Sequence, residues 1–238
     1  MSLHPLFKLG GRLRLCASMV RPKTTLVDVG TDHAYLPIWL AKQDLITSAI
    51  AADINLRPLQ KAQQNIKRYR VQNTVSARLS DGLNAVFPFE ADDIVIAGMG
   101  GEMIIQIISA APWLKNKQKR LILQPMTSAE PLRVFLAAQD FSVLVEQAVT
   151  DDDHSYSVLL AQYDSTGVNV DELYPHIGKL NAQTQDNRVY MSHRVVNLEK
   201  RAQGLILCGK TEEATVLLGI IKRIKEMIEK GQSDDINR

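Results

Sequence analysis

"DVGTDHAYL", residues 28–36, is the stretch that decides the fold. It begins at the end of an apolar run, "TLVDVG" (25–30), and leads into a stretch of helical length, 34–43. A strand that turns at a glycine and passes into a helix is the opening unit of an open α/β sheet. Such sheets bind ligands at the carboxyl ends of their strands. The turn is therefore the first place to look for a binding site.

The same alternation continues along the chain. Four more runs of strand type are found, at 47–53, 74–82, 92–98 and 119–125. Helical stretches lie between and after them, at 56–71, 101–111 and 128–139. Short apolar runs bounded by Gly, Asp or Pro and separated by helices predict a parallel sheet covered by helices.

Two further strand patterns, 141–149 and 155–163, follow one another with no helix between them. They predict an antiparallel hairpin on the sheet edge. A dinucleotide-binding fold would instead continue with more strand–helix units. The predicted fold class is therefore α/β, a class I Rossmann-like methyltransferase sheet closed by an antiparallel hairpin.

From about Asp164 the pattern becomes helical, which divides the chain into residues 1–163 and 164–238. Two apolar seams repeat at heptad spacing, one at Met191, Val195, Leu198, Ala202 and Leu205, the other at Ala214, Leu217, Ile221, Ile224 and Ile228. With Gly209 as a stop and Thr211 as a start, the seams predict an antiparallel helical hairpin of coiled-coil type. Such a pair can simply pack on the body, serve as an RNA-recognition arm, or form a dimer; we expect a monomer.

The composition is that of a globular chain, with 238 residues, 45% hydrophobic and 23% charged. Two cysteines in no metal-like spacing predict neither a disulfide framework nor a metal site, and they favour a cytoplasmic location. No apolar stretch is long enough to predict a membrane span. The net charge is only +2, but basic clusters lie within 1–25, 57–70 and 115–120. Such clusters bind phosphates or are solvated helix faces.

The turn itself excludes the common phosphate-binding cofactors. A dinucleotide fingerprint needs glycines at positions 30, 32 and 35, and this chain has Gly30, Asp32 and Tyr35. A carboxylate at the second position repels a nearby phosphate, which argues against NAD, FAD and ATP.

S-adenosylmethionine fits the turn better, because it carries a sulfonium and an ammonium but no phosphate. Asp28 and Asp32 are candidates to meet the ammonium, and backbone N–H groups near His33 to meet the carboxylate, while Gly30 lets the chain turn beneath the ligand. The alternatives are that Asp32 only caps the next helix and that His33 is structural.

Candidate residues also follow the next three strands. Asp53, with Ile54 beside it, ends the second strand at the position where an acid binds ribose hydroxyls. Asp81 and Gly82 follow the third strand, where an adenine amino group would bind. The fourth strand ends in "IAGMGG" (96–101), where methyl donor and acceptor should meet; its candidates are Ala97, Gly98, Met99 and Gly100.

Several of these blocks together resemble the bacterial tRNA (adenine-22-N1)-methyltransferase family, TrmK. The resemblance runs from about Arg12 to Tyr163 and is carried by "DVGTDHAYLPIWLA", "IAADIN", "LSDGL", "DDIVIAGMGGEMI" and "LILQP". It implies a Rossmann-like methyltransferase domain with a C-terminal coiled-coil hairpin. It also implies methylation of N1 of an adenine in the D-arm region of tRNA.

N1 of adenine already carries a lone pair, so the reaction needs alignment and no general base. We expect Gln124 to touch the base edge and Tyr156 to stack on the base, with Arg12 and Arg14 on nearby phosphates. The alternatives are a methyltransferase for another RNA, a protein or a small molecule, and a non-catalytic RNA-binding relative.

Overall fold

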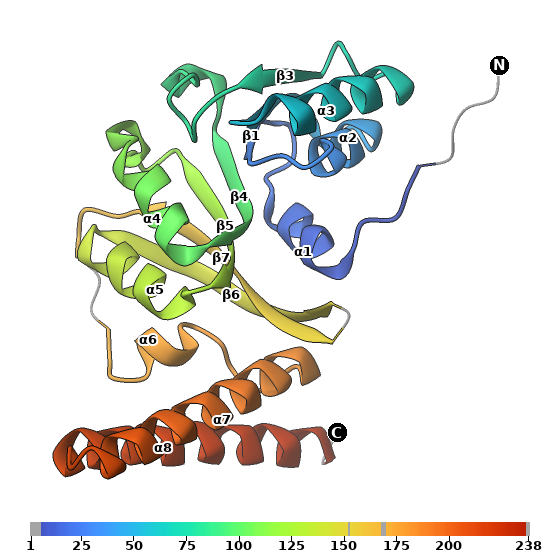
Figure 1. The fold of residues 1–238 in the computed structure, drawn as a ribbon. Helices are drawn as coiled ribbons and strands as arrows, with labels where there is room; N and C mark the ends of the chain where they lie inside the picture. Colours follow the sequence, from blue (N-terminus) through green and yellow to red (C-terminus); the bar gives the residue numbers. More distant parts are fainter. Residues whose placement is uncertain (1–5, 152, 168–169, 237–238) are drawn as a thin grey trace.

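The structure, a computed structural model, describes residues 6–151, 153–167 and 170–236. Its centre is a seven-stranded sheet in the order β3-β2-β1-β4-β5-β7-β6 (Figure 1). The strands are β1 (Thr24–Val29), β2 (Ile46–Asp53), β3 (Val75–Leu79), β4 (Asp93–Gly100), β5 (Arg120–Thr127), β6 (Phe141–Asp151) and β7 (His154–Tyr163). Strands β1 to β5 are parallel, and β7 runs antiparallel to both β5 and β6. The predicted parallel sheet with its closing hairpin is confirmed.

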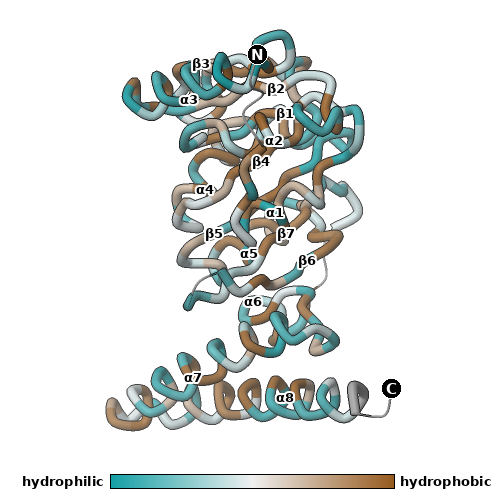
Figure 2. Tube along the Cα trace, turned by 90° about the vertical axis from the view of Figure 1, so that its right-hand side faces the viewer, coloured by the Kyte–Doolittle hydropathy of each residue, from teal (hydrophilic) through white to brown (hydrophobic). Residues whose placement is uncertain are grey.

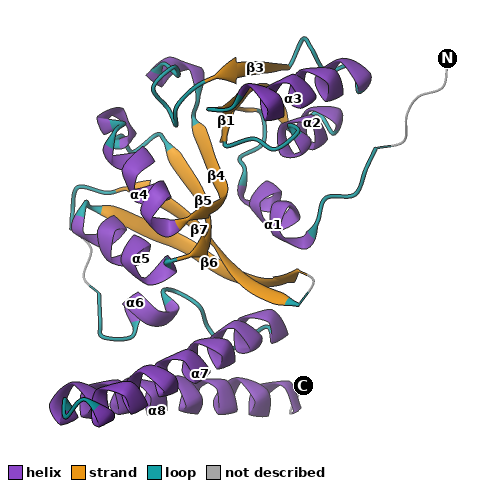
Figure 3. Ribbon diagram, in the orientation of Figure 1, coloured by secondary structure: helices purple, strands orange, loops and turns teal. Residues whose placement is uncertain are grey.

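Helices cover both faces of the sheet (Figure 3). Three pack on one face, namely α1 (Gly11–Met19), α2 (Tyr35–Lys42) and α3 (Leu56–Arg68), and two on the other, α4 (Gly101–Ser109) and α5 (Ala129–Ala138). Along β4, Ile94 and Ile96 belong to the core under α4 and α5, whereas Val95 belongs to the core under α1 and α2. Because successive strand side chains point to opposite faces, a strand buried on both sides must be apolar throughout.

Helix α1 was not predicted from the sequence. Its N-terminus is held by Asp151 at the end of β6, whose carboxylate accepts hydrogen bonds from the backbone N–H groups of Gly11 at 3.1 Å and Arg12 at 3.0 Å. These two N–H groups have no partner inside the helix, and a carboxylate also suits the positive end of the helix dipole. The cap comes from about 140 positions away in the chain, so no local pattern reveals it.

The C-terminal part is helical, with α6 (Tyr174–Ile177), α7 (Gln185–Leu207) and α8 (Thr211–Ile236). Helices α7 and α8 lie side by side below β6, and the apolar strands form the brown centre of the body above them (Figures 1 and 2). The two predicted seams face each other, since nearly all of their residues are buried in one cluster. Gly209 turns the chain between the helices at φ 74°. Short 3-10 turns occupy Pro88–Glu90 and Pro112–Leu114.

A buried ion pair joins the body to the C-terminal helices. Arg133 of α5 binds Glu146 of β6 at 2.6 Å, and both side chains are fully buried. The same guanidinium donates to the carbonyls of Pro175 and His176 at the end of α6. Gly178 follows at φ 58°, and a Cβ there would lie 1.8 Å from a Glu146 oxygen. Only glycine therefore lets the chain pass this pair.

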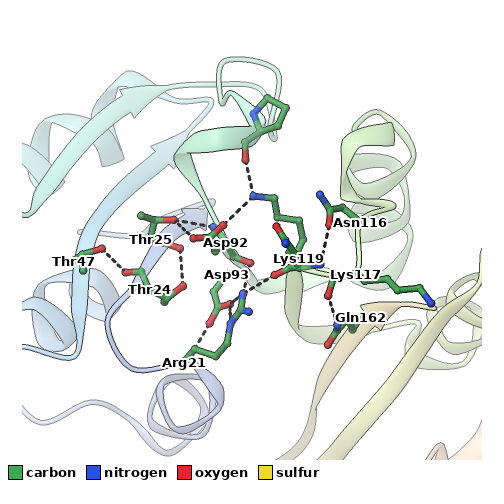
Figure 4. Close-up of polar contacts among 12 residues, drawn as sticks. Arg21, Thr24, Thr25, Thr47, Asp92, Asp93, Asn116, Lys117, Lys119 and Gln162 are labelled. Carbon is green, nitrogen blue, oxygen red and sulfur yellow. Dashed lines mark hydrogen bonds and ion pairs between the residues drawn. The ribbon is translucent and has the colours of Figure 1, made fainter. Parts of the chain in front are cut away.

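A second polar network lies at the amino ends of the central strands (Figure 4). Asp93, which is fully buried, accepts from the backbone N–H and the Nε of Arg21, both at 2.7 Å. Asp92 accepts from Thr25 at 2.9 Å and from Lys119 at 3.0 Å. These bonds tie the segment after α1 to β4 and β5 at the sheet edge opposite the ligand-binding edge, so we assign the network to the fold and not to a site.

Candidate active site

A cavity of about 340 Å³ opens at the carboxyl ends of β1, β2 and β4, the edge predicted to bind ligand. Its walls are formed by Val29, Gly30, Asp53, Ile54, Asn55, Ser80, Asp81, Gly82, Ala97, Gly98, Met99, Met103 and Ile107. Its charged lining residues are both carboxylates, with no lysine or arginine among them. Most of the residues predicted for a nucleoside cofactor are therefore brought together in one acidic cavity.

The first turn of the sheet is held by its backbone. The N–H groups of Gly30 and Thr31 both donate to the carbonyl of Ala52, at 2.8 and 2.9 Å. Gly30 has φ 71°, and a Cβ there would lie 2.0 Å from the terminal methyl of Met99. Both the backbone conformation and the close approach of Met99 therefore require glycine at this position.

The rest of the turn takes a rare conformation. His33 and Ala34 have φ values of 63° and 57°, in the left-handed region that residues with a Cβ seldom adopt. The side-chain amide of Asn65, from α3, donates to the His33 carbonyl at 2.9 Å and holds the turn in place. Backbone strain of this kind collects at functional sites.

Asp32 is one of the exposed residues among those predicted to bind the cofactor. Its side chain is 78% exposed, and one of its oxygens lies 2.8 Å from Nδ1 of His33. Helix α2 begins at Tyr35 with Ala34 at its N-cap and no side-chain cap. Asp32 is therefore not the helix cap that we considered as an alternative.

Asp28 lies beneath the turn on β1 and is buried. Burial raises the pKa of Asp28 to about 7, opposed by the hydroxyl of Thr31, which donates to it at 2.5 Å, and reinforced by the negative charge of Asp53. A carboxylate that is costly to ionise alone is stabilised when a cation binds beside it. Asp28 is not among the residues that line the cavity, so its contact with an ammonium stays a prediction.

Asp53 stands at the end of β2, with only 8% of its surface exposed. One of its oxygens, Oδ1, accepts from the backbone N–H of Asn55 at 2.7 Å, which fixes the carboxylate and leaves Oδ2 for a ligand. Ile54 beside it is exposed, and Asp81 and Gly82 line the same wall of the cavity.

At the other end of the cavity Gly98 has φ 79° and donates its N–H to Oε1 of Gln124 at 3.0 Å. The same oxygen accepts from Nη1 of Arg12 at 2.7 Å. Gln124 is fully buried, and its amide nitrogen donates to the carbonyl of Pro125. In the structure the Gln124 side chain links β4, β5 and α1, and its contact with a base edge stays a prediction.

The remaining predicted residues lie around this point or away from it. Gly100 precedes α4 and pairs with Thr127 of β5. Arg12 comes within 3.1 Å of where a Cβ of Gly98 would lie, whereas Arg14 is exposed and lines a groove with Gln147. Tyr156 lines a separate cavity beside the end of β5.

Sequence reasoning missed five residues of the cofactor cavity: Val29, Asn55, Ser80, Met103 and Ile107. Asn55 and Ser80 lie within the quoted "IAADIN" and "LSDGL", so their position after β2 and β3 was a usable signal. Met103 and Ile107 are four residues apart in α4, which places both on the cavity side of that helix.

The donor set fits S-adenosylmethionine. Carboxylates suit its two cationic groups, Asp53 suits a ribose, and apolar Ile54, Met103 and Ile107 suit an adenine ring. Within the described residues no cluster of His, Cys, Asp and Glu side chains is arranged to hold a metal ion. The described helices also include none with the length and apolar content needed to cross a membrane.

Comparisons with known proteins agree with this geometry. Residues 9–159 match the model of the methyltransferase domain family. A tRNA (adenine(22)-N(1))-methyltransferase of Bacillus subtilis is 34% identical over 155 residues, which cover 65% of this chain and 65% of that protein.

Solved structures extend the likeness to nearly the whole chain. The Bacillus subtilis M1A22 tRNA methyltransferase TrmK is 27% identical, with a TM-score of 0.78 over 94% of this chain and 100% of that one. Streptococcus pneumoniae Sp1610, solved in complex with S-adenosyl-L-methionine, is 31% identical, with a TM-score of 0.74 over 91% of this chain and 98% of that one. The chain therefore belongs to the methyltransferase domain family, among the S-adenosylmethionine-dependent enzymes represented by TrmK.

Proposed function

We propose that this chain transfers a methyl group from S-adenosylmethionine to N1 of an adenine in tRNA, at the position 22 named for its relatives. The observation that carries the proposal is the acidic cavity, free of basic lining residues, that ends at Gly98 beside Arg12. The cofactor supplies an electrophilic methyl on a sulfonium. The chain's own residues bind the cofactor, orient it toward the base and exclude water from the cavity.

Three carboxylates hold the donor in this proposal. Asp53 binds the ribose through its free Oδ2, and Asp28, with Asp32 at the mouth of the turn, faces the ammonium. Ile54, Asp81, Gly82 and Ala97 enclose the nucleoside, and the backbone at His33 meets the carboxylate. Because these groups are fixed by β1, β2 and the Asn65 contact, little reorganisation accompanies binding.

The acceptor end is built from backbone. The carbonyls at Gly98 and Met99, with Gly100 allowing close approach, face the base in our proposal. No proton has to be removed from N1, so these groups need only align the base and stabilise the charge that moves onto it. Gln124 acts as a positioning residue, since it fixes both Gly98 and Arg12.

Arg12 and Arg14 bind RNA phosphates in this scheme, Arg12 next to the methylated nucleotide and Arg14 further out on α1. N1 lies on the Watson–Crick edge, so a paired or stacked adenine has to be turned out to reach the cavity. Tyr156 is then available to stack on a base beside β5.

Residues 1–163 form the catalytic domain in our proposal, and 164–238 form the helical coiled-coil domain. We further propose a monomer in the cytoplasm. The two apolar seams are buried against each other within one chain, which supports the monomer, and light scattering coupled to gel filtration tests it.

The decisive experiment is labelled methyl transfer to bulk tRNA from a strain that lacks this gene, followed by mapping of the modified nucleotide. We expect 1-methyladenosine at position 22. Label in another nucleotide, or in protein alone, would contradict the proposal.

A further inference from the structure

A second cavity, of about 250 Å³, lies between the end of β5, strand β7 and helix α7. It adjoins the cofactor cavity at the carboxyl end of the sheet. Met99 of β4, which lines the cofactor cavity, pairs in the sheet with Pro125 of β5, which lines the second one. A molecule held in the second cavity therefore lies next to the point of methyl transfer.

The floor of this second cavity holds two hydroxyl groups with hydrogens to donate. Ser157 and Tyr190 are both buried, and their oxygens accept from Nη2 of Arg133 at 3.3 and 3.1 Å. Because the guanidinium only donates, each hydroxyl keeps its own hydrogen for another acceptor. Hydrogen bonds from a cation polarise these hydroxyls and make them better donors.

Two more polar atoms at the cavity have no partner among the described residues. They are Oγ of Ser155 and Nε of Arg194, both of which are buried. Arg194 donates from Nη2 to Glu130 at 2.8 Å, and its Nε–H has no acceptor among the described residues. Buried polar atoms without a hydrogen bond are rare in folded proteins, so these two donors lack the acceptor that such groups normally have.

The charge around this cavity differs from that around the first. Its lining includes Arg194 and no aspartate or glutamate, whereas the cofactor cavity is lined by two aspartates and no base. His193 and Asn197 add further polar groups on α7. The acidic cavity suits a cation, and the second cavity suits an anion whose oxygens accept hydrogen bonds.

We propose that the second cavity binds the phosphate and ribose of a nucleotide next to the methylated adenosine in the RNA strand. The inference rests on the proposed function, because the neighbouring cavity supplies the methyl group. Hydroxyl and Nε–H donors match phosphate oxygens, and Asn197 and His193 at the rim match a ribose. Holding this nucleotide would fix where the adjacent adenine enters the active site.

Ser155→Ala is the sharpest test. It removes a hydroxyl that has no partner within the described protein, so the melting temperature should hold or rise slightly. We expect unmodified tRNA transcript to bind about tenfold more weakly in fluorescence anisotropy, the loss typical of one hydrogen bond to a charged group. The affinity for S-adenosylmethionine, measured by calorimetry, should not change. Ser192→Ala, an exposed serine on α7 outside the cavity, is the matched control.

A Ser155→Ala protein that binds tRNA as tightly as the wild type would overturn the inference. A second arm uses adenosine 5′-monophosphate with adenosine as its control. Loss of nucleotide binding in Ser155→Ala with unchanged tRNA binding would assign the cavity to a free nucleotide and also refute the RNA assignment. If the wild type methylates tRNA and the variant is unaffected, only this inference fails. If the wild type transfers no methyl group to tRNA, the proposed function fails.

Discussion

Asp28→Asn should separate the stability of this protein from its cofactor affinity. Burial raises the pKa of Asp28 from 3.8 to about 7, so the folded state holds a proton that the unfolded state has lost between those pH values. The contribution of Asp28 to the free energy of unfolding is fully present below pH 3.8 and declines as the pH rises from 3.8 to about 7. A difference of about three pH units corresponds to at most about 4 kcal/mol, lost by pH 7.

The substitution keeps the shape of the side chain and removes its titration. In urea unfolding between pH 5 and 8, the wild type should lose about 1.4 kcal/mol per pH unit up to about pH 7 from this group, and the variant should lose none of it. Arg78 lowers the pKa of Glu90 to about 2, and His176 is the main group that lowers the pKa of Glu130 to about 2. These two carboxylates change the free energy of unfolding with pH only below pH 4.5. Their contribution to stability is present above that pH and does not disturb the comparison.

Cofactor binding should change in the opposite sense. A bound ammonium favours the ionised form of Asp28, so the wild type should bind S-adenosylmethionine more tightly as the pH rises from 6 to 8 and release a proton on binding. Asp28→Asn should bind S-adenosylmethionine more weakly and should lack the pH dependence that Asp28 contributes. Calorimetry in two buffers of different ionisation enthalpy measures both quantities. Parallel unfolding curves for the two proteins across pH 5–8 would refute the reasoning.

Three other substitutions test separate parts of the structure. Glu146→Gln leaves Arg133 buried without its counter-charge and should cost about 3–5 kcal/mol in urea unfolding; a loss below about 1 kcal/mol would contradict this. Gly30→Ala should weaken cofactor binding more than tenfold, because a Cβ there meets Met99 and the left-handed backbone costs about 1–2 kcal/mol; unchanged calorimetry would count against it. Arg12→Ala should weaken tRNA binding about tenfold in filter assays, because one charged contact is lost, and should leave the cofactor affinity unchanged. An equal loss of both affinities would contradict this prediction.

The sheet was readable from the sequence because its strands are buried on both faces. Each of β1, β2, β4 and β5 is an apolar run that stops at Gly, Asp or Pro, and each of their ends carries a candidate ligand residue. The heptad seams of α7 and α8 were also readable, because each helix has one repeating apolar face and the two faces pack on each other. Local pattern and tertiary burial coincide in these elements.

Features that depend on contacts between distant segments were not readable. Helix α1 carries two arginines and is capped by Asp151, so nothing near it in the chain marks its start. Gln124 follows a buried strand like a ligand-binding residue, yet its oxygen is used by Arg12 and Gly98. The second cavity is lined by three segments, and of the quoted blocks only "LILQP" reaches it, through Pro125.

Strand β6 connects two regions that the sequence would treat as separate. At its middle Glu146 binds Arg133, which donates to the His176 carbonyl of α6, and two residues further on the backbone N–H of Ala148 donates to Asn187 of α7. At its far end Asp151 anchors the helix that carries Arg12. The strand thus connects the C-terminal helices to the helix whose Arg12 guanidinium lies beside Gly98. Cutting the chain near residue 164 would remove the α6 carbonyls and the Tyr190 hydroxyl that the buried Arg133 contacts, so we expect the shortened chain to lose stability at β6, the strand whose Asp151 caps the helix that carries Arg12.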